Sequence, residues 1–221
     1  MTWLRVLGKL LISVGIGVLL FVVWTLYGTG LYTARQQDAL SEEFDRLPAF
    51  ERTTPEGNPL PPGPPPGYDP GPGAPVFRMH LPTIEDKPMV VVEGVDTDEL
   101  KLGPGHYPSC RPGFEPPLCT RWDEVFPGQK GRAIVSGHRT TYGQPFWSLD
   151  KMAKGDPIEI ETRWGDYTYV VTSTEVVPAD SRLIVVESDK YELVLTTCNP
   201  RFSAAERLIV YAELETEGAA R

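Results

Sequence analysis

The feature that most constrains this chain is an uncharged apolar run near its N-terminus. Residues 10–27 (LLISVGIGVLLFVVWTLY) are 18 consecutive residues without a charge, close to the roughly 20 that a helix needs to cross the hydrocarbon core of a bilayer. Trp24 and Tyr27 stand at the end of the run, where aromatic side chains suit a membrane interface. The sequence therefore predicts a transmembrane helix over residues 10–27.

The charges on either side of this run predict its orientation. Arg5 and Lys9 precede it, whereas acidic residues dominate beyond it, so the positive-inside rule places residues 1–9 in the cytoplasm and the C-terminal bulk outside the cell. A cleaved signal peptide is the alternative, but the run is long for one and Gly28-Thr-Gly30 is a poor cleavage site. We therefore predict a retained signal anchor in a single-pass protein of the cell membrane.

Residues 28–75 are predicted to form an extracellular stalk. Within it, residues 55–75 hold ten prolines in 21 positions, a composition that favours polyproline II and cannot bury a core. At about 3.1 Å per residue, this linker could hold the next domain on the order of 60 Å farther from the bilayer. A proline-rich ligand for a partner module is the alternative function of this segment.

The chain beyond the linker has room for one compact domain of about 140 residues, which we place at residues 76–216, with a tail at 217–221. Strand-type runs dominate this domain and helical pieces are few and short, so an all-β barrel or sandwich is expected. The runs expected to form strands cover residues 76–80, 88–92, 132–136, 157–163, 167–177, 191–197 and 207–214. The net charge of -9 without a basic stripe excludes a nucleic-acid binder, because phosphate recognition needs clustered Lys and Arg.

Three cysteines lie beyond the predicted membrane helix, so two can pair and one is left over. Cys110 and Cys119 flank a turn-rich loop with little else to hold it, and closing so short a ring would contribute about 2–3 kcal/mol. This pairing would leave Cys198 as a free thiol. A rival pairing of Cys198 with either of the others would block that thiol and could serve redox regulation.

Cys198 ends a strand-type run, with His138 upstream and Arg207 nine positions later. A cysteine nucleophile needs a base and a group that stabilises developing negative charge, and these two residues are on segments that can pair as neighbouring strands. His80 and His106 are the competing bases. The competing cation is Arg201, but Arg207 opens an apolar strand, where a charge without a purpose is costly to bury. The alternative for Cys198 is a small buried hydrophobic residue.

These residues lie in segments that resemble those of the sortases, the membrane-anchored cysteine transpeptidases of Gram-positive bacteria, across residues 77–214. The segments that carry the resemblance are Leu195-Thr-Thr-Cys198 with Arg207, Gly137-His138-Arg-Thr-Thr-Tyr-Gly143, Gly103-Pro-Gly-His-Tyr-Pro108 and Gly155-Asp-Pro-Ile158. They look most like class E, with class D next. Two features depart from the family pattern: Val194 fills the first position of the usual Thr-Leu-x-Thr-Cys, and the loop from Cys110 to Cys119 looks like an insertion.

The resemblance implies a closed eight-stranded β-barrel with a few short helices, preceded by the membrane helix and the proline-rich linker. It gives Cys198 the nucleophile's position, His138 the acid/base position and Arg207 the position of the group that faces the oxyanion. Candidate substrate contacts are Thr196 and Thr197 beside the thiol, His106 in a Gly-Pro-Gly turn, and Leu183 and Val185 in a loop that either walls a groove or fills the core.

The activity implied by the resemblance is transpeptidation. A sorting motif of the Leu-Ala-x-Thr-Gly or Leu-Pro-x-Thr-Gly type, near the C-terminus of a secreted protein, would be cut after Thr through a thioester on Cys198, and an amine of a peptidoglycan precursor would resolve that thioester. With ordinary pKa values of about 8.5 for a thiol and about 6.5 for an imidazole, the ion-paired form would be only about 1% of the neutral pair.

Other functions stay open at this point. A pilin-polymerising sortase would use a lysine of another protein as its acceptor, although the sequence has no obvious N-terminal lid motif. A cysteine peptidase would release its substrate to water, and a non-catalytic surface β-barrel would bind a partner with Cys198 incidental. The sequence has no transition-metal motif and no phosphate loop, so no metal or cofactor is expected, with calcium on scattered carboxylates left open.

Overall fold

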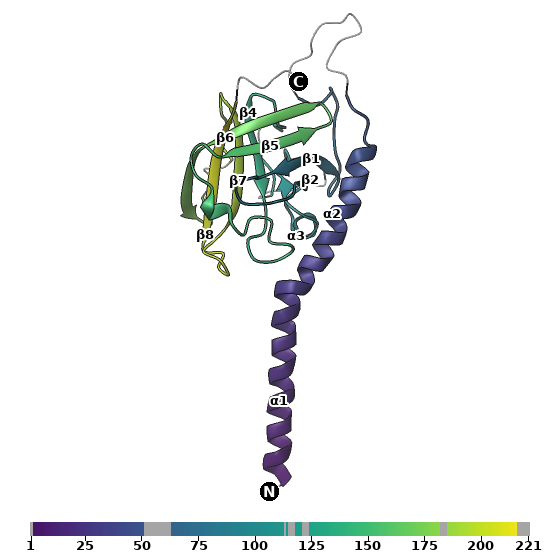
Figure 1. Ribbon diagram of the computed structural model, residues 1–221, viewed down its shortest axis with the longest axis vertical. Coiled ribbons are helices and arrows are strands. Elements are labelled where there is room, and N and C mark those ends of the chain that lie inside the picture. The colour runs from purple at the N-terminus through teal and green to yellow at the C-terminus, as the bar shows by residue number, and fades with distance from the viewer. Residues whose placement is uncertain are drawn as a thin grey trace, which may run out of the picture.

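Figure 1 shows the computed structural model of the chain, which describes residues 2–50, 63–112, 114, 118–120, 124–181 and 185–215. A β-barrel lies beside the upper part of one long N-terminal helix, and the lower part of that helix projects away from the barrel (Figure 1). The tail predicted at 217–221 and most of the proline-rich linker lie outside the described residues.

Eight strands close into a barrel in the order β1-β2-β3-β4-β7-β8-β6-β5, which confirms the predicted fold. The strands are β1 (Pro75–His80), β2 (Met89–Glu93), β3 (Gly105–His106), β4 (Gly131–Ser136), β5 (Pro157–Thr162), β6 (Gly165–Pro178), β7 (Tyr191–Asn199) and β8 (Glu206–Leu214). Seven of them follow the runs read from the sequence. The eighth, β3, has only two residues and is too short to leave an alternating pattern.

The interior of the barrel is filled by apolar and aromatic side chains, and the two largest of them use their polar atoms in hydrogen bonds. Trp164 and Tyr169 are among the largest fully buried residues. The indole N–H of Trp164 donates to the Pro127 carbonyl at 3.0 Å, and the Tyr169 hydroxyl accepts from the backbone N–H of Gly128 at 2.9 Å. Because each buried polar group has a partner, burial of these rings stabilises the fold without an unpaired polar atom.

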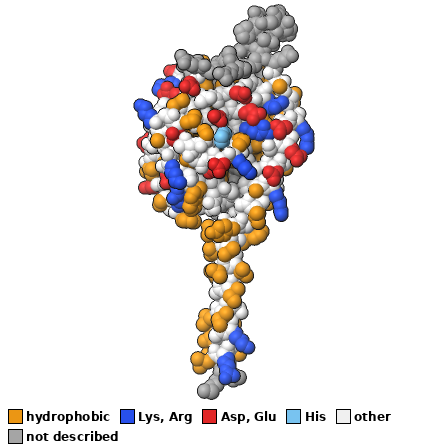
Figure 2. All heavy atoms as spheres, in the orientation of Figure 1, with side chains coloured by type: hydrophobic (Ala, Val, Ile, Leu, Met, Phe, Trp, Pro, Cys, Tyr) orange, Lys and Arg blue, Asp and Glu red, His pale blue; other side chains and the backbone are white. Residues whose placement is uncertain are grey.

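The N-terminal helix runs almost without a break through α1 (Thr2–Val23), a π-helical stretch η1 (Trp24–Gly28) and α2 (Thr29–Arg46). By length and composition it is the one helix of the described chain that could cross a membrane. Its apolar side chains are exposed along α1, where Figure 2 shows them as orange patches along the projecting helix. An exposed apolar surface of this extent suggests a membrane anchor.

The structure corrects the first part of the predicted stalk, because α2 packs against the barrel. Phe44 is fully buried, under the guanidinium of Arg78 from β1. The Gln37 amide accepts from the backbone N–H of Val90 at 2.7 Å and donates to its carbonyl at 2.9 Å. The elements on either side of the linker, α2 before it and β1 after it, therefore belong to one packed unit.

Two short helices lie on the rim of the barrel. Helix α3 (Thr97–Leu100) is capped by Asp96, whose carboxylate accepts from the Thr97 N–H at 2.5 Å. The second is a single 3-10 turn, η2 (Leu149–Lys151). Both agree with the expectation of few and short helical pieces in this domain.

Candidate active site

Cys198 and Arg207 face each other across two antiparallel strands. Near the end of β7, Cys198 pairs with Arg207 at the start of β8. Cys198 is a free cysteine and is partly exposed, whereas Cys110 and Cys119 form the disulfide favoured by the sequence. The strand ladder alone therefore places a free thiol beside a guanidinium.

His138 reaches the same strand end through the parallel pairing of β4 with β7. Ser136 pairs with Thr196, and the Thr197 hydroxyl then donates to the Gly137 carbonyl at 2.7 Å. Gly137 packs so tightly that a Cβ built on it would lie 2.7 Å from the ring of Phe146, so only glycine fits here without a shift. These contacts fix the chain immediately before His138.

The His138 side chain is partly buried and leaves one ring nitrogen unused. Its Nε2 is buried and makes no hydrogen bond with any residue that the structure describes. Burial lowers the pKa of His138 below the ordinary 6.5, since a less hydrated site disfavours the imidazolium. Near pH 7 the imidazole is therefore mainly neutral. Its ring lies against that of Tyr142, with centroids 5.1 Å apart and planes tilted by 33°.

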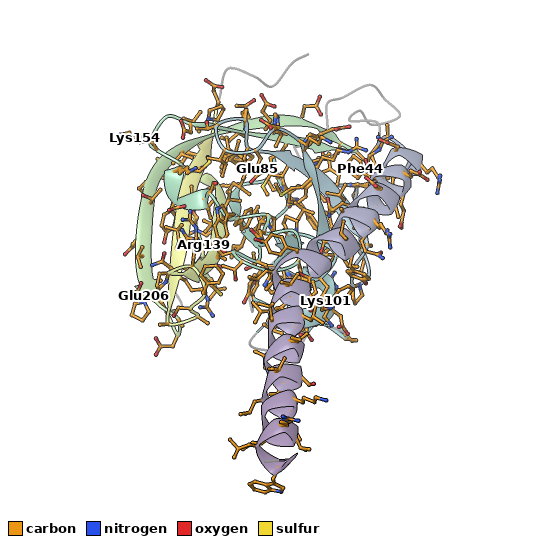
Figure 3. The ribbon with its side chains drawn as sticks, turned by 60° about the horizontal axis from the view of Figure 1, so that its bottom comes forward. Phe44, Glu85, Lys101, Arg139, Lys154 and Glu206 are labelled. Atoms are coloured by element: carbon orange, nitrogen blue, oxygen red, sulfur yellow. A yellow bond between two sulfur atoms is a disulfide. The ribbon has the colours of Figure 1, made fainter. Side chains whose placement is uncertain are left out.

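Arg139, next to His138, links the histidine loop to the strand that carries the cysteine. It is 4% exposed, and its Nη1 donates to the Asn199 side-chain oxygen at 2.6 Å and to the Cys198 carbonyl at 3.3 Å. Its Nη2 pairs with Asp150 at 3.1 Å. Arg139 lies on the β8 side of the barrel in Figure 3. We predicted no role for Arg139 from the sequence. The signal that could have indicated one is a charged residue directly after the candidate histidine.

The guanidinium of Arg207 is held by its own strand end. Its Nη1 donates to the carbonyl oxygens of Ala204 and Glu206, both at 3.0 Å. The neighbouring Glu206 carboxylate accepts from the Asn199 amide at 2.8 Å. Neutral carbonyl groups thus orient the Arg207 guanidinium, and Glu206 does not neutralise its charge.

One cleft of about 800 Å³ brings the predicted site residues together. Cys198, His138 and Arg207 line it, with Thr196, Thr197 and Val185 from the predicted substrate contacts. Val95, Leu100, Leu118, Val186 and the Cys110–Cys119 disulfide add an apolar lining. The inserted loop is therefore part of the cleft wall. Leu183 lies outside the described residues.

His106 does not line the cleft, so its predicted substrate contact is corrected. Its side chain is completely buried. Its Nδ1 lies 2.9 Å from the Glu93 carboxylate and its Nε2 lies 3.0 Å from the Val125 carbonyl. The sequence Gly-Pro-Gly suggested an exposed turn at His106. Gly105 instead begins β3, where His106 pairs with Glu93 of β2 and its ring points into the protein.

Glu93, His106, Arg111 and Glu124 form what we call the His106 cluster. One ligand atom from each of Glu93, His106 and Glu124 lies within 4.8 Å of the others, a spacing that a divalent metal could use. Arg111, however, lies 2.7 Å from the Glu124 carboxylate and 3.5 Å from that of Glu93. Cationic groups of the chain therefore already balance the two acids, as in a buried ion network.

Mutual attraction sets the charges in this cluster. Burial lowers the pKa of His106 and raises that of Glu93, but their ion pair outweighs burial, so His106 ends above its ordinary pKa and Glu93 below. Burial, the hydrogen bond to Glu93 and the charge of Glu93 together raise the pKa of Glu124 to about 8. Near pH 7 Glu124 is therefore mainly protonated.

A free thiol, an imidazole and a guanidinium at one end of a closed β-barrel define a candidate thiol-enzyme site. The family model described as the sortase domain matches residues 79–215. The chain belongs to the sortase family.

Two similar proteins are named as sortases D and E1. Sortase D of Bacillus subtilis is 32% identical over 143 residues, which cover 62% of this chain and 63% of that protein. Sortase SrtE1 of Streptomyces coelicolor is 28% identical over 225 residues, 96% of this chain and 57% of that protein. The chain thus spans less than two thirds of the length of either relative.

A solved structure shares both the fold and part of the sequence. The crystal structure of sortase E1 from Streptomyces coelicolor, with a tripeptide in its active site, is 27% identical to this chain and aligns with a TM-score of 0.54. The alignment covers 66% of this chain and 91% of that one. The shared part is therefore the barrel.

Proposed function

We propose that this protein is a membrane-anchored cysteine transpeptidase of the class E type, with its N-terminus in the cytoplasm and its barrel outside the cell. The observation that carries the proposal is the gathering of Cys198, His138 and Arg207 on one cleft at the adjoining ends of three strands. The tripeptide in the active site of the related sortase E1 supports a peptide as the ligand of this cleft.

In the first half-reaction, Cys198 attacks the Thr carbonyl of a Leu-Ala-x-Thr-Gly or Leu-Pro-x-Thr-Gly motif in a secreted protein. The thiol proton passes to the imidazole of His138, which lines the same cleft, and from there to the departing amine as the peptide bond breaks. Arg207 stabilises the oxyanion of the tetrahedral intermediate, because its charge is held in place by backbone carbonyls.

In the second half-reaction, an amine of a peptidoglycan precursor attacks the thioester. His138 takes the proton from that amine and returns it to the sulfur, so Cys198 is regenerated and one new amide bond remains. The histidine loop touches the end of the apolar helix, where the Gln144 amide donates to the Leu26 carbonyl at 3.3 Å. This contact supports a site close to the outer membrane face, where both substrates occur.

The test is covalent capture on the full chain in lipid nanodiscs. We expect incubation with a Leu-Ala-x-Thr-Gly or Leu-Pro-x-Thr-Gly peptide to give an acyl adduct on Cys198 by mass spectrometry, and an added glycine or diaminopimelate-type amine to convert that adduct into the joined product. Cys198→Ala should form no adduct, and Arg207→Gln should form it about 100–1,000-fold more slowly.

Other outcomes would assign a different function. An adduct that decays to free acid at a rate unaffected by amine would point to a cysteine peptidase. Joining to a protein lysine in preference to these amines would point to a pilin-polymerising enzyme. No adduct with any peptide, with native-state alkylation also failing to label Cys198, would leave a non-catalytic binding barrel.

A further inference from the structure

The segment that follows His138 has a strained backbone. Tyr142, Gly143 and Gln144 have φ values of +50°, +75° and +54° in succession. Such left-handed conformations suit glycine, but they cost about 1–3 kcal/mol each for residues with a side chain. A loop with two such residues needs support from the structure around it.

That support comes from the N-terminal helix at the point where η1 meets α2. The backbone N–H of Tyr142 donates to the Thr29 hydroxyl at 3.2 Å, and the Gln144 side chain donates to the Leu26 carbonyl. A Cβ built on Gly143 would lie 3.2 Å from the Thr33 side chain, so the loop also packs closely on the next turn of the helix.

The Thr29 hydroxyl is well placed for this contact because its own proton is already used. It donates to the Thr25 carbonyl at 2.8 Å, which leaves its lone pairs directed away from the helix to accept the Tyr142 N–H. The helix is in turn fixed to the barrel by Thr33, which donates to the Lys101 carbonyl at 2.8 Å. Figure 3 shows Lys101 beside the helix at the end of the barrel from which α1 leaves.

The supported loop then contacts the imidazole. The Tyr142 ring lies against the His138 ring, with centroids 5.1 Å apart and planes inclined by 33°. The His138 carbonyl accepts from Phe146 at 3.2 Å, which closes the loop around this pair. Among the described residues the imidazole Nε2 has no hydrogen bond, so packing against the Tyr142 ring helps to hold the imidazole in place.

We propose that Thr29 is a positioning residue for His138: the end of the membrane helix holds the loop 142–144 in its left-handed form, and through the Tyr142 ring this loop orients the imidazole for proton transfer. The inference rests on the proposed role of His138 as the acid/base group. It means that the anchor takes part in building the site as well as tethering it.

The test compares Thr29→Val with Thr29→Ser in the full chain in nanodiscs. Valine keeps the shape but removes the hydroxyl acceptor, and misplacing the imidazole should lower the kcat for adduct formation by about 10- to 100-fold while leaving the KM for the peptide within about twofold. Serine keeps the acceptor and should restore kcat. Thr25→Val is the matched control, because the Thr25 hydroxyl donates to the Phe21 carbonyl one turn earlier and makes no hydrogen bond to the loop 142–144 among the described residues.

A second variant covers the case in which Thr29→Val loosens the helix. Gln144→Met removes the other hydrogen bond from the loop to the helix and should also lower kcat, with an unfolding temperature unchanged from that of the parent. Wild-type kcat in both Thr29→Val and Gln144→Met would overturn the inference and leave the proposed function standing. A parent chain that forms no adduct would overturn both, and equal losses in Thr29→Val and Thr25→Val would show an effect of helix stability alone.

Discussion

His138 and His106 are two histidines of one barrel in opposite surroundings. His106 is completely buried and both of its ring nitrogens have partners, a carboxylate and a backbone carbonyl. His138 lines the cleft, and its Nε2 has no partner among the described residues. A histidine whose polar atoms are all used inside the protein stabilises it, whereas one with a free nitrogen on a cleft can act on a ligand.

The two surroundings also move the pKa in opposite directions. At His138 burial acts without a neighbouring carboxylate, so the pKa falls and the neutral ring is favoured. At His106 burial is stronger, but Glu93 and Glu124 outweigh it, so the pKa rises and the ring stays charged. Burial alone therefore does not decide the charge of a histidine, because the nearest carboxylates do.

The largest effect expected from this comparison is on activity. His138→Ala should slow adduct formation on Cys198 by about 100- to 10,000-fold, with an unfolding temperature close to that of the parent, because the free Nε2 makes no contact that stabilises the fold. His80→Ala is the matched control, since His80 pairs with Glu159 on the surface. Retention of activity in His138→Ala would remove it from the mechanism.

The second-largest expected effect is a loss of folding stability. His106→Leu leaves the Glu93 carboxylate buried without its partner, and breaking a buried ion pair costs about 3–5 kcal/mol. Chemical unfolding of the full chain in detergent would measure this loss. Adding EDTA to the parent should leave its unfolding midpoint unchanged, because Arg111 supplies the counter-charge. A large shift with EDTA would instead assign a metal to the His106 cluster.

The barrel and the central part of the site could be predicted because their signals are local. Alternating burial along β5, where Ile158 and Ile160 face the core, is visible as a pattern in the sequence. Cys198 and Arg207 lie on consecutive strands joined by a short connection, so their pairing follows from a simple antiparallel ladder. For Cys198 and Arg207, the sequence motif and the strand pairing therefore predict the same position in the site.

The rest depends on contacts that no local pattern carries. The His106 cluster takes its members from β2, β3 and the segments around Arg111 and Glu124, so its existence depends on the order of strands in the barrel. The bond from Thr29 to Tyr142 joins residues 113 positions apart, and α2 packs on the barrel through pairs such as Gln37 and Val90, which are 53 positions apart. The polar residues of α2 indicate a helix in water, and only tertiary contact shows which of its faces is covered.

The smallest expected effect is on the pH dependence of stability, and Glu124 is the residue that tests it. Its folded-state pKa of about 8 lies above the ordinary value of about 4.3 for an unfolded Glu, so between these values the folded protein binds more protons than the unfolded chain. Stability from this group is therefore fully present below about pH 4.3 and is lost as the pH rises toward 8, by at most about 1.4 kcal/mol per pH unit.

Other groups titrate nearby, so the comparison between the parent and Glu124→Gln is made from pH 5 to 6.5. In that range the raised pKa of His106 adds little, because an unfolded histidine is still largely protonated, and the lowered pKa of His138 acts equally in both proteins. Glutamine can still donate to Glu93 but cannot ionise. The difference in unfolding free energy between the two proteins should therefore change steadily with pH, to the relative advantage of Glu124→Gln as the pH rises. A difference that stays constant would mean that Glu124 is ionised throughout, and that Arg111 and His106 fully compensate both carboxylates.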